Sequence, residues 1–190
     1  MKKNISILIV GVGGQGTLLT SRILGDVAMK LGYDVKMSEL HGMAQRGGSV
    51  VTYVRMGEKV SSPIIEKNSS DVILAFEELE ALRWLDYLKE DGILILNTQK
   101  IDPMPVIMRK AAYPSDIVEK LKAASDNMVM TDALGIAREI DNIKVVNVVM
   151  LGKLAKVLDM EKDIFIEAIR NTVPEKFLLP NLKAFDSGYN

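Results

Sequence analysis

An apolar run that leads directly into a glycine-rich turn constrains this chain more than any other feature. Residues 5–10 (ISILIV) are dominated by β-branched and aliphatic side chains, as is typical of a strand buried on both faces of a sheet. Residues 11–16 (GVGGQG), which we call the glycine loop, follow at once. Apolar residues then recur at every fourth position: Leu19, Ile23, Val27 and Leu31. This spacing predicts a helix over residues 17–31 that Gly32 ends, and the strand–turn–helix order indicates an α/β protein.

The next two predicted strands are joined too closely for a parallel pair. They cover residues 33–39 and 49–55, so that only residues 40–48, which we call the second loop, connect them. A parallel crossover needs about a dozen residues or more and usually contains a helix. We therefore expect a mixed sheet at that edge.

Strands and helices alternate again after residue 70. We predict strands at 71–76, 92–97, 106–108 and 127–130, and helices at 77–89 and from a cap at Ser115 or Asp116 through residue 123. Pro103 and Pro105 mark a turn, and the chain from Asp132 is predicted to be helical, with breaks near residues 141–142, near Asp159 and at Pro174. With no linker or repeat, residues 1–190 are expected to form a single three-layer α/β/α domain with a mostly parallel, mixed sheet and a helical C-terminal third.

The composition excludes several kinds of site and partner. With no cysteine and one histidine, His41, the chain cannot form disulfides, cysteine-ligated zinc or iron–sulfur sites, or multi-histidine metal sites. The formal net charge is −1 and only 5% of residues are aromatic, so we expect no nucleic-acid partner. No stretch approaches the roughly 18 apolar residues of a membrane span, and residues 5–10 are too short for a signal peptide. We expect no membrane partner and a cytoplasmic protein.

The glycine loop is the first candidate site. Glycines between a strand and a helix allow a phosphate to approach free N–H groups at a positive helix end. The alternative is that they only permit a tight turn and close packing. Glu39 ends the second predicted strand, about where a nicotinamide domain has its ribose-binding acid. The second crossover helix of such a domain is missing, however.

The second loop is the other candidate. Arg46 could hold an anion through two parallel hydrogen bonds, and His41 could donate or accept one. The alternatives are a surface salt bridge for Arg46 and a capping role for His41. If the first two strands are neighbours, both loops lie at the carboxyl end of the sheet and form one binding edge. Whether Arg46 serves a ligand or a subunit interface stays open.

Three further groups are interpreted structurally. Glu77, Glu78 and Glu80 open a predicted helix, where negative charge is favourable. The eleven methionines, such as Met128 and Met130, are interpreted mainly as core filler, and Trp84 as a core or interface residue.

Several blocks of this sequence closely resemble the small subunits of indolepyruvate:ferredoxin oxidoreductases, within the gamma-domain family of 2-oxoacid:ferredoxin oxidoreductases. The resemblance covers essentially the whole chain. It rests on the glycine loop, on residues 38–50 (SELHGMAQRGGSV), on residues 55–57 (RMG), and on these further positions: Asp71, Glu77, Glu80-Ala81, Asn97-Thr98, Asn147, Leu151-Gly152, Asn181 and Ala184-Phe185. Pyruvate-type relatives are similar at the glycine loop and at Arg46-Gly47 but differ in the residues before that pair.

The resemblance implies that this chain works with a larger subunit that carries thiamine diphosphate, magnesium and 4Fe–4S clusters. Together they would decarboxylate aryl pyruvates oxidatively to aryl-acetyl-coenzyme A, with coenzyme A as co-substrate and ferredoxin reduced through the large subunit. Consistently, the Gly25-Asp26 pair lacks the Gly-Asp-Gly pattern of a thiamine–magnesium site. We expect no catalytic residue, metal or resident cofactor on this chain alone. The expected ligand-contacting residues are Gly11, Gly13, Gly14, Gln15, Gly16, His41, Gln45, Arg46 and Gly47.

Three alternatives stay open. One is the gamma subunit of a pyruvate or ketoisovalerate oxidoreductase, another a stand-alone nucleotide- or dinucleotide-binding protein, and the last a scaffold without a role in turnover. The large permanent contact that a subunit needs, together with a mean hydropathy of +0.14, predicts an apolar face that is exposed without the partner.

Overall fold

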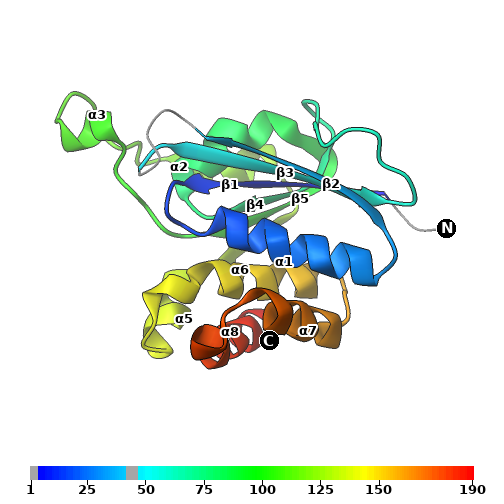
Figure 1. Ribbon diagram of the computed structural model, residues 1–190. Helices are drawn as coiled ribbons and strands as arrows, with labels where there is room; N and C mark the ends of the chain where they lie inside the picture. Colours follow the sequence, from blue (N-terminus) through cyan, green and yellow to red (C-terminus); the bar gives the residue numbers. More distant parts are fainter. Residues whose placement is uncertain (1–3, 42–46) are drawn as a thin grey trace.

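A six-stranded mixed sheet forms the centre of the computed structural model, which describes residues 4–41 and 47–190 (Figure 1). Its strands lie in the order β2-β3-β1-β4-β5-β6. β3 is antiparallel to both of its neighbours, whereas β1, β4, β5 and β6 pair in parallel. The predicted mixed edge is therefore confirmed. The strand bounds are β1 Ile5–Val12, β2 Asp34–His41, β3 Ser49–Gly57, β4 Ser70–Ala75, β5 Leu88–Asn97 and β6 Met128–Thr131.

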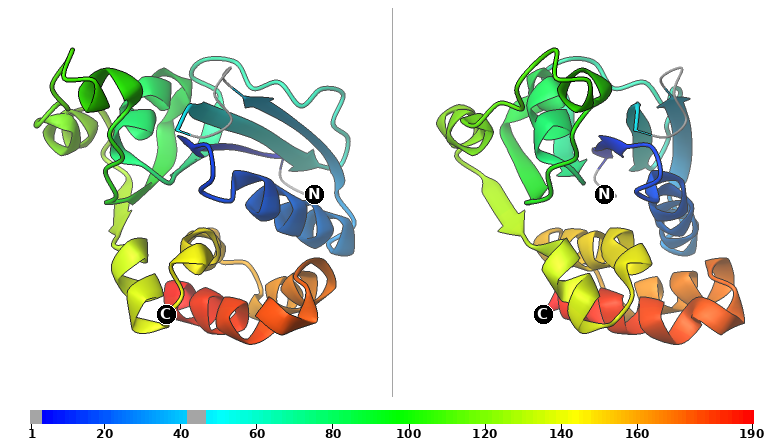
Figure 2. Two further views of the ribbon diagram at one scale, coloured as in Figure 1. Left: turned by 60° about the vertical axis from the view of Figure 1, so that its left-hand side comes forward. Right: turned by 90° about the vertical axis from the view of Figure 1, so that its left-hand side faces the viewer.

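Helices cover both faces of the sheet, which confirms the predicted three layers (Figure 2). On one face lie α1 Thr17–Lys30, α5 Ala133–Glu139, α6 Val146–Val157, α7 Lys162–Thr172 and α8 Glu175–Tyr189. On the other lie α2 Glu78–Trp84 and α4 Ile117–Ala124. Three short elements complete the chain: the helix α3 Met104–Ile107 and the 3-10 turns η1 Leu85–Tyr87 and η2 Ile143–Val145. No helix of the described residues is long and apolar enough to cross a membrane.

β1 separates two hydrophobic cores, as its apolar run predicts. Ile7 and Ile9 point into the core beneath α1 and α6, and Leu8 and Val10 into the core beneath α2 and α4. All four are fully buried. Successive side chains of a strand point to opposite faces, so only a strand covered on both sides buries an uninterrupted apolar run.

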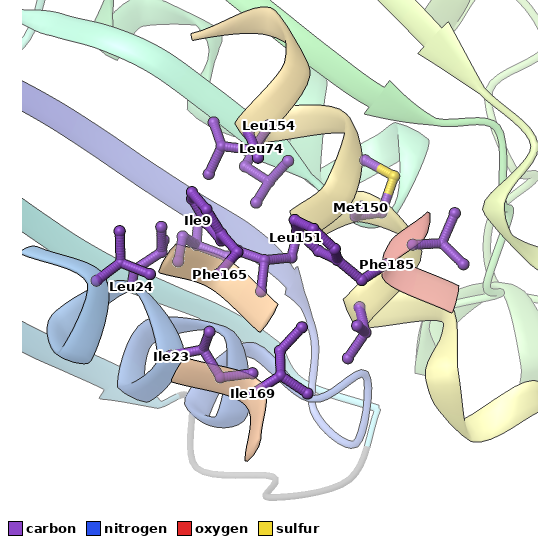
Figure 3. Close-up of a cluster of buried hydrophobic side chains, with 14 of the residues drawn as sticks. Ile9, Ile23, Leu24, Leu74, Met150, Leu151, Leu154, Phe165, Ile169 and Phe185 are labelled. Atoms are coloured by element: carbon purple, nitrogen blue, oxygen red, sulfur yellow. The ribbon is translucent and has the colours of Figure 1, made fainter. Parts of the chain in front are cut away.

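The larger core extends from the sheet into a second helical layer (Figure 3). Phe165 of α7 and Phe185 of α8 stack with their ring centroids 5.4 Å apart and both are fully buried. α6 and α8 approach closely because each presents a glycine to the other. A Cβ on Gly152 would lie 2.3 Å from the Phe185 carbonyl oxygen, and a Cβ on Gly188 would lie 2.0 Å from that of Val149.

Some predicted elements are wrong in extent or type. The helix predicted over residues 77–89 ends at Trp84, and β5 already begins at Leu88, opposite Ser70 of β4. The strand predicted over residues 106–108 is instead part of α3 and the turn after it. Asp116 occupies the N-cap position of α4 without a side-chain hydrogen bond. The predicted breaks in the C-terminal helical third are confirmed.

The interpretation of methionine as core filler is wrong for many of these residues. Met56 and Met150 are fully buried, but exposed fractions of 41% or more are found at Met29, Met37, Met104, Met108 and Met130. Trp84 is half-buried and packs in the core beneath α2, with its ring 5.1 Å from that of Tyr87.

Replacing Gly152 by alanine should destabilise the fold. The new methyl group would overlap the α8 backbone, so α6 and α8 must separate, and overpacking of this kind costs about 1–3 kcal/mol. We expect Gly152→Ala to lower the free energy of unfolding in urea by at least about 2 kcal/mol. Gly25→Ala is the matched control, because its Cβ would meet only the flexible end of Met37 in the middle of α1. Gly25→Ala should be neutral, or stabilising by up to about 1 kcal/mol; an equal loss in both variants would contradict the close-packing argument.

Candidate functional site

The glycine loop and the end of the second loop meet at the carboxyl end of β1. The Gly13 N–H donates to the Gly48 carbonyl oxygen at 2.8 Å, and the Gly47 N–H donates to that of Gly13 at 3.5 Å. The strand order differs from the one assumed from the sequence, since β3 lies between β1 and β2. The loops still adjoin, because β3 begins at Ser49, directly after the second loop, and pairs with β1.

The side chain of Gln15 holds the glycine loop in shape. Its Oε1 accepts from the Val12 N–H at 2.7 Å, and its Nε2 donates to the Phe76 carbonyl oxygen at 2.9 Å and to Gln99 Oε1 at 3.3 Å. A Cβ on Gly11 would lie 2.8 Å from Gln15 Oε1, so the side chain can fold back only over a glycine. Gln15 thus ties the turn after β1 to the chain just beyond β4.

The same turn presents backbone donors at the start of α1. Gly14 and Gly16 have φ values of 102° and 84°, a conformation that favours glycine. Neither N–H donates a hydrogen bond within the described part of the chain. The first turn of α1 holds no acidic residue, and Asn147 Nδ2 donates to the Gly16 carbonyl oxygen at 3.3 Å. The partial positive charge of this helix end is therefore open to an anion.

A cavity of about 610 Å³, the main cavity, opens in front of these donors. Such a volume is in the range of small-molecule sites. Lys144, on η2, is the cationic side chain in its lining. The full lining is Val12, Gly13, Gly14, Gln15, Gly16, Leu19, Gly47, Gln99, Ile101, Leu134, Ile143, Lys144, Val146 and Asn147.

The structure brings together some of the residues predicted to contact a ligand. Gly13, Gly14, Gln15, Gly16 and Gly47 line the main cavity, whereas Gly11 lies beneath Gln15. The backbone of His41 ends β2, paired with Val50, and Gln45 and Arg46 lie outside the described residues. Their contact with a ligand stays a prediction. Lys144 and Gln99 were missed, and Asn147 was noted only as part of the family resemblance.

Glu39 lies on the opposite side of the glycine loop. It borders a smaller cavity of about 280 Å³, where its Oε2 accepts from Thr52 Oγ1 at 3.0 Å and from Thr17 Oγ1 at 3.4 Å. A ribose-binding acid normally lies on the parallel strand next to the glycine turn. Here Glu39 lies on β2, which the antiparallel β3 separates from β1, so the topology does not favour the dinucleotide-binding alternative.

The three glutamates that open α2 are buried, with exposed fractions of 4% or less. Glu77 occupies the N-cap position of α2, the helix start at which an acidic residue was expected to be favourable, and its Oε2 accepts from the Glu80 N–H at 2.9 Å. Burial raises the pKa of Glu77, although a hydrogen bond from the Tyr113 hydroxyl at 2.5 Å opposes the shift. Glu78 pairs with Lys100 at 3.6 Å. Capping alone therefore does not account for the burial of all three.

The fold and the loop arrangement define a known class of oxidoreductase subunit. Residues 6–190 match the sequence profile of the pyruvate ferredoxin/flavodoxin oxidoreductase family. The chain belongs to this family, as its motifs predicted. It is 40% identical to the indolepyruvate oxidoreductase subunit IorB of Pyrococcus horikoshii, over 98% of this chain and 95% of that one.

Two other relatives show how far the similarity extends. The pyruvate/ketoisovalerate oxidoreductases common subunit gamma of Thermococcus kodakarensis is 29% identical, over 98% of this chain and 96% of that one. The crystal structure of the pyruvate oxidoreductase subunit PORC from Thermotoga maritima superposes with a TM-score of 0.74 at 25% identity. The match covers 99% of this chain and 96% of that one.

Gln15→Glu tests whether the hydrogen bonds of Gln15 fix the conformation of the glycine loop. A glutamate keeps the acceptor for the Val12 N–H but places a second oxygen against the Phe76 carbonyl oxygen and Gln99 Oε1, to which Gln15 now donates. Losing these bonds and leaving a charge near them should lower the free energy of unfolding by about 2 kcal/mol. Because the penalty comes from the charge, it should shrink at pH 4. Urea unfolding of the variant and of the wild type at pH 7 and at pH 4 measures this loss of stability. If the variant is as stable as the wild type at pH 7, Gln15 does not fix the conformation of the glycine loop.

Proposed function

We propose that this chain is the small, cluster-free subunit of a cytoplasmic indolepyruvate-type 2-oxoacid:ferredoxin oxidoreductase. The observation that carries the proposal is the full-length similarity to four relatives named indolepyruvate oxidoreductase subunit IorB, at 40–41% identity. The gamma subunits named for pyruvate and ketoisovalerate reach 28–29%. The specific block of residues 38–50 supports the same choice.

The large catalytic subunit supplies the cofactors in this proposal. It carries thiamine diphosphate, magnesium and 4Fe–4S clusters, and passes electrons to ferredoxin. Two observations support this division of labour. The sequence has no cysteine for a cluster, and the described residues contain no group of three or more His, Cys, Asp or Glu side chains suited to a metal ion.

The main cavity receives the phosphate-bearing end of coenzyme A in this proposal. Open N–H groups, a helix N-terminus and Lys144 together favour an anionic group. Two components of the reaction carry phosphates, and thiamine diphosphate is assigned to the large subunit. Coenzyme A therefore remains for this chain, whose role is to bind and orient it and to exclude water from the shared site.

Reconstitution with the large subunit tests the proposed function. The purified chain alone should bind no iron and show no turnover, whereas the complex should reduce ferredoxin with indolepyruvate and coenzyme A. The genomic neighbour that encodes a thiamine- and cluster-binding chain is the partner to co-express. A strong preference of the complex for pyruvate or ketoisovalerate would favour the gamma-subunit alternative. Nicotinamide binding by the isolated chain would favour the stand-alone alternative.

Lys144→Gln tests the ligand of the main cavity and the scaffold alternative together. Removing one charged hydrogen bond to a phosphate costs about 1.5 kcal/mol or more, which corresponds to roughly a tenfold rise in KM for coenzyme A. The KM for the 2-oxoacid and the assembly of the complex should not change. Lys156→Gln, also exposed but outside the cavity lining, is the matched control. Unchanged kinetics in both variants would contradict the assignment of coenzyme A to this cavity.

A further inference from the structure

Residues 101–113, which we call the α3 arm, project from the body of the molecule (Figure 1). The arm leaves the sheet after β5, contains α3 and returns before α4. In the view turned by 60° it again lies at the periphery (Figure 2). Among the described helices, α3 alone has no substantial packing contact with another helix or strand.

The α3 arm is nevertheless rigidly folded. Pro103 caps α3 and Pro105 lies in its first turn, where a proline's missing N–H removes no helical hydrogen bond. Arg109 ends the helix with a φ of 57°. The N–H groups of Arg109 and Lys110 then donate to the carbonyl oxygens of Val106 and Pro105, both within 2.9 Å, in the pattern of a Schellman motif.

One buried carboxylate fastens both ends of the arm. Glu77 Oε1 accepts from the Ile101 N–H at 3.2 Å and from the Tyr113 hydroxyl at 2.5 Å. Glu77 itself is only 1% exposed. The N-cap residue of α2 thus joins the two ends of the arm at its base. A preorganised loop loses little entropy when it binds a partner.

The tip of the arm is apolar and its flank is basic. Met104, Ile107 and Met108 are 56%, 61% and 53% exposed. Arg109 and Lys110 are exposed beside them, and Asp102 is the one acidic residue in the arm's sequence. Clustered large apolar side chains on a projecting element are typical of an interaction site, and methionine adapts well to a partner surface.

We propose that the α3 arm is the element by which this chain docks into the large catalytic subunit. Its apolar tip enters an apolar groove of that subunit, and Arg109 and Lys110 pair with carboxylates at the rim of the groove. This inference rests on the proposed function, because it needs a catalytic partner. A protruding tip requires a recess, and its net positive flank requires acidic neighbours.

The position of the arm links docking to the main cavity. Gln99 and Ile101, the residues at which the arm begins, line that cavity. The base of the arm therefore adjoins the main cavity. Dimerisation of the isolated wild-type chain that substitutions at the tip abolish would instead assign the arm to a second copy of this chain.

A triple variant of the tip tests the proposal in the reconstituted complex. Met104→Ser, Ile107→Ser and Met108→Ser together remove the apolar anchors without touching the core, so the thermal unfolding of the isolated chain should stay as in the wild type. Association with the large subunit, measured by titration with ferredoxin reduction as the readout, should weaken by roughly a hundred-fold. Excess variant chain should restore wild-type turnover.

Two further variants sharpen the test. Arg109→Glu with Lys110→Glu should slow association and reverse its salt dependence, because added salt then screens a repulsion instead of an attraction. Phe177→Ser with Leu179→Ser, at exposed positions of α8, is the matched control and should bind as the wild type does. Wild-type affinity of the triple variant would overturn the docking assignment alone. If the wild-type chain itself fails to bind the large subunit, the proposed function fails, and the docking assignment with it.

Discussion

The side-chain amide of Gln15 is the interaction on which the geometry of the site depends. It joins the Val12 N–H to the carbonyl oxygen of Phe76, and so fixes the turn after β1 relative to the end of β4. Asn97, at the end of β5, donates to the same carbonyl oxygen at 3.0 Å. One acceptor therefore connects three strand ends. With the turn fixed in this way, Gly14 and Gly16 line the main cavity, and their N–H groups donate no hydrogen bond within the described residues.

The cavity and the α3 arm share a single peptide segment. Phe76, whose carbonyl oxygen accepts from Gln15, is followed directly by Glu77, whose carboxylate fastens the arm. A displacement of the arm's base would therefore act on the residue next to the anchor of the glycine loop. The hydrogen bonds that hold the glycine loop and those that hold the arm thus converge on two consecutive residues.

Local sequence patterns predicted those parts of the fold that local chemistry determines. The apolar run of β1 required cover on both faces, and the short second loop required an antiparallel neighbour. Sequence patterns failed to predict the structure where tertiary contacts determine it. Residues 89–92 (KEDG) carry no strand signal, yet β5 begins at Leu88 because β4 offers Ser70 as a partner. The glycine loop could be predicted from sequence as a candidate site, but Lys144 reaches the same cavity only because η2, more than a hundred residues further along the chain, packs beside it.

The buried glutamates of α2 raise an electrostatic question, since acidic groups at this end of the sheet would oppose an anion in the main cavity. Their local partners limit that effect. Burial raises the pKa of Glu77 and so favours its neutral form. Glu78 lies 3.6 Å from the ammonium of Lys100, and Glu80 accepts from Arg83 Nε at 3.2 Å. Cations thus lie beside Glu78 and Glu80, and the helix end at the glycine loop has no acidic residue in its first turn. The carboxylate of Glu39, which borders the smaller cavity at the glycine loop, accepts hydrogen bonds from Thr17 and Thr52.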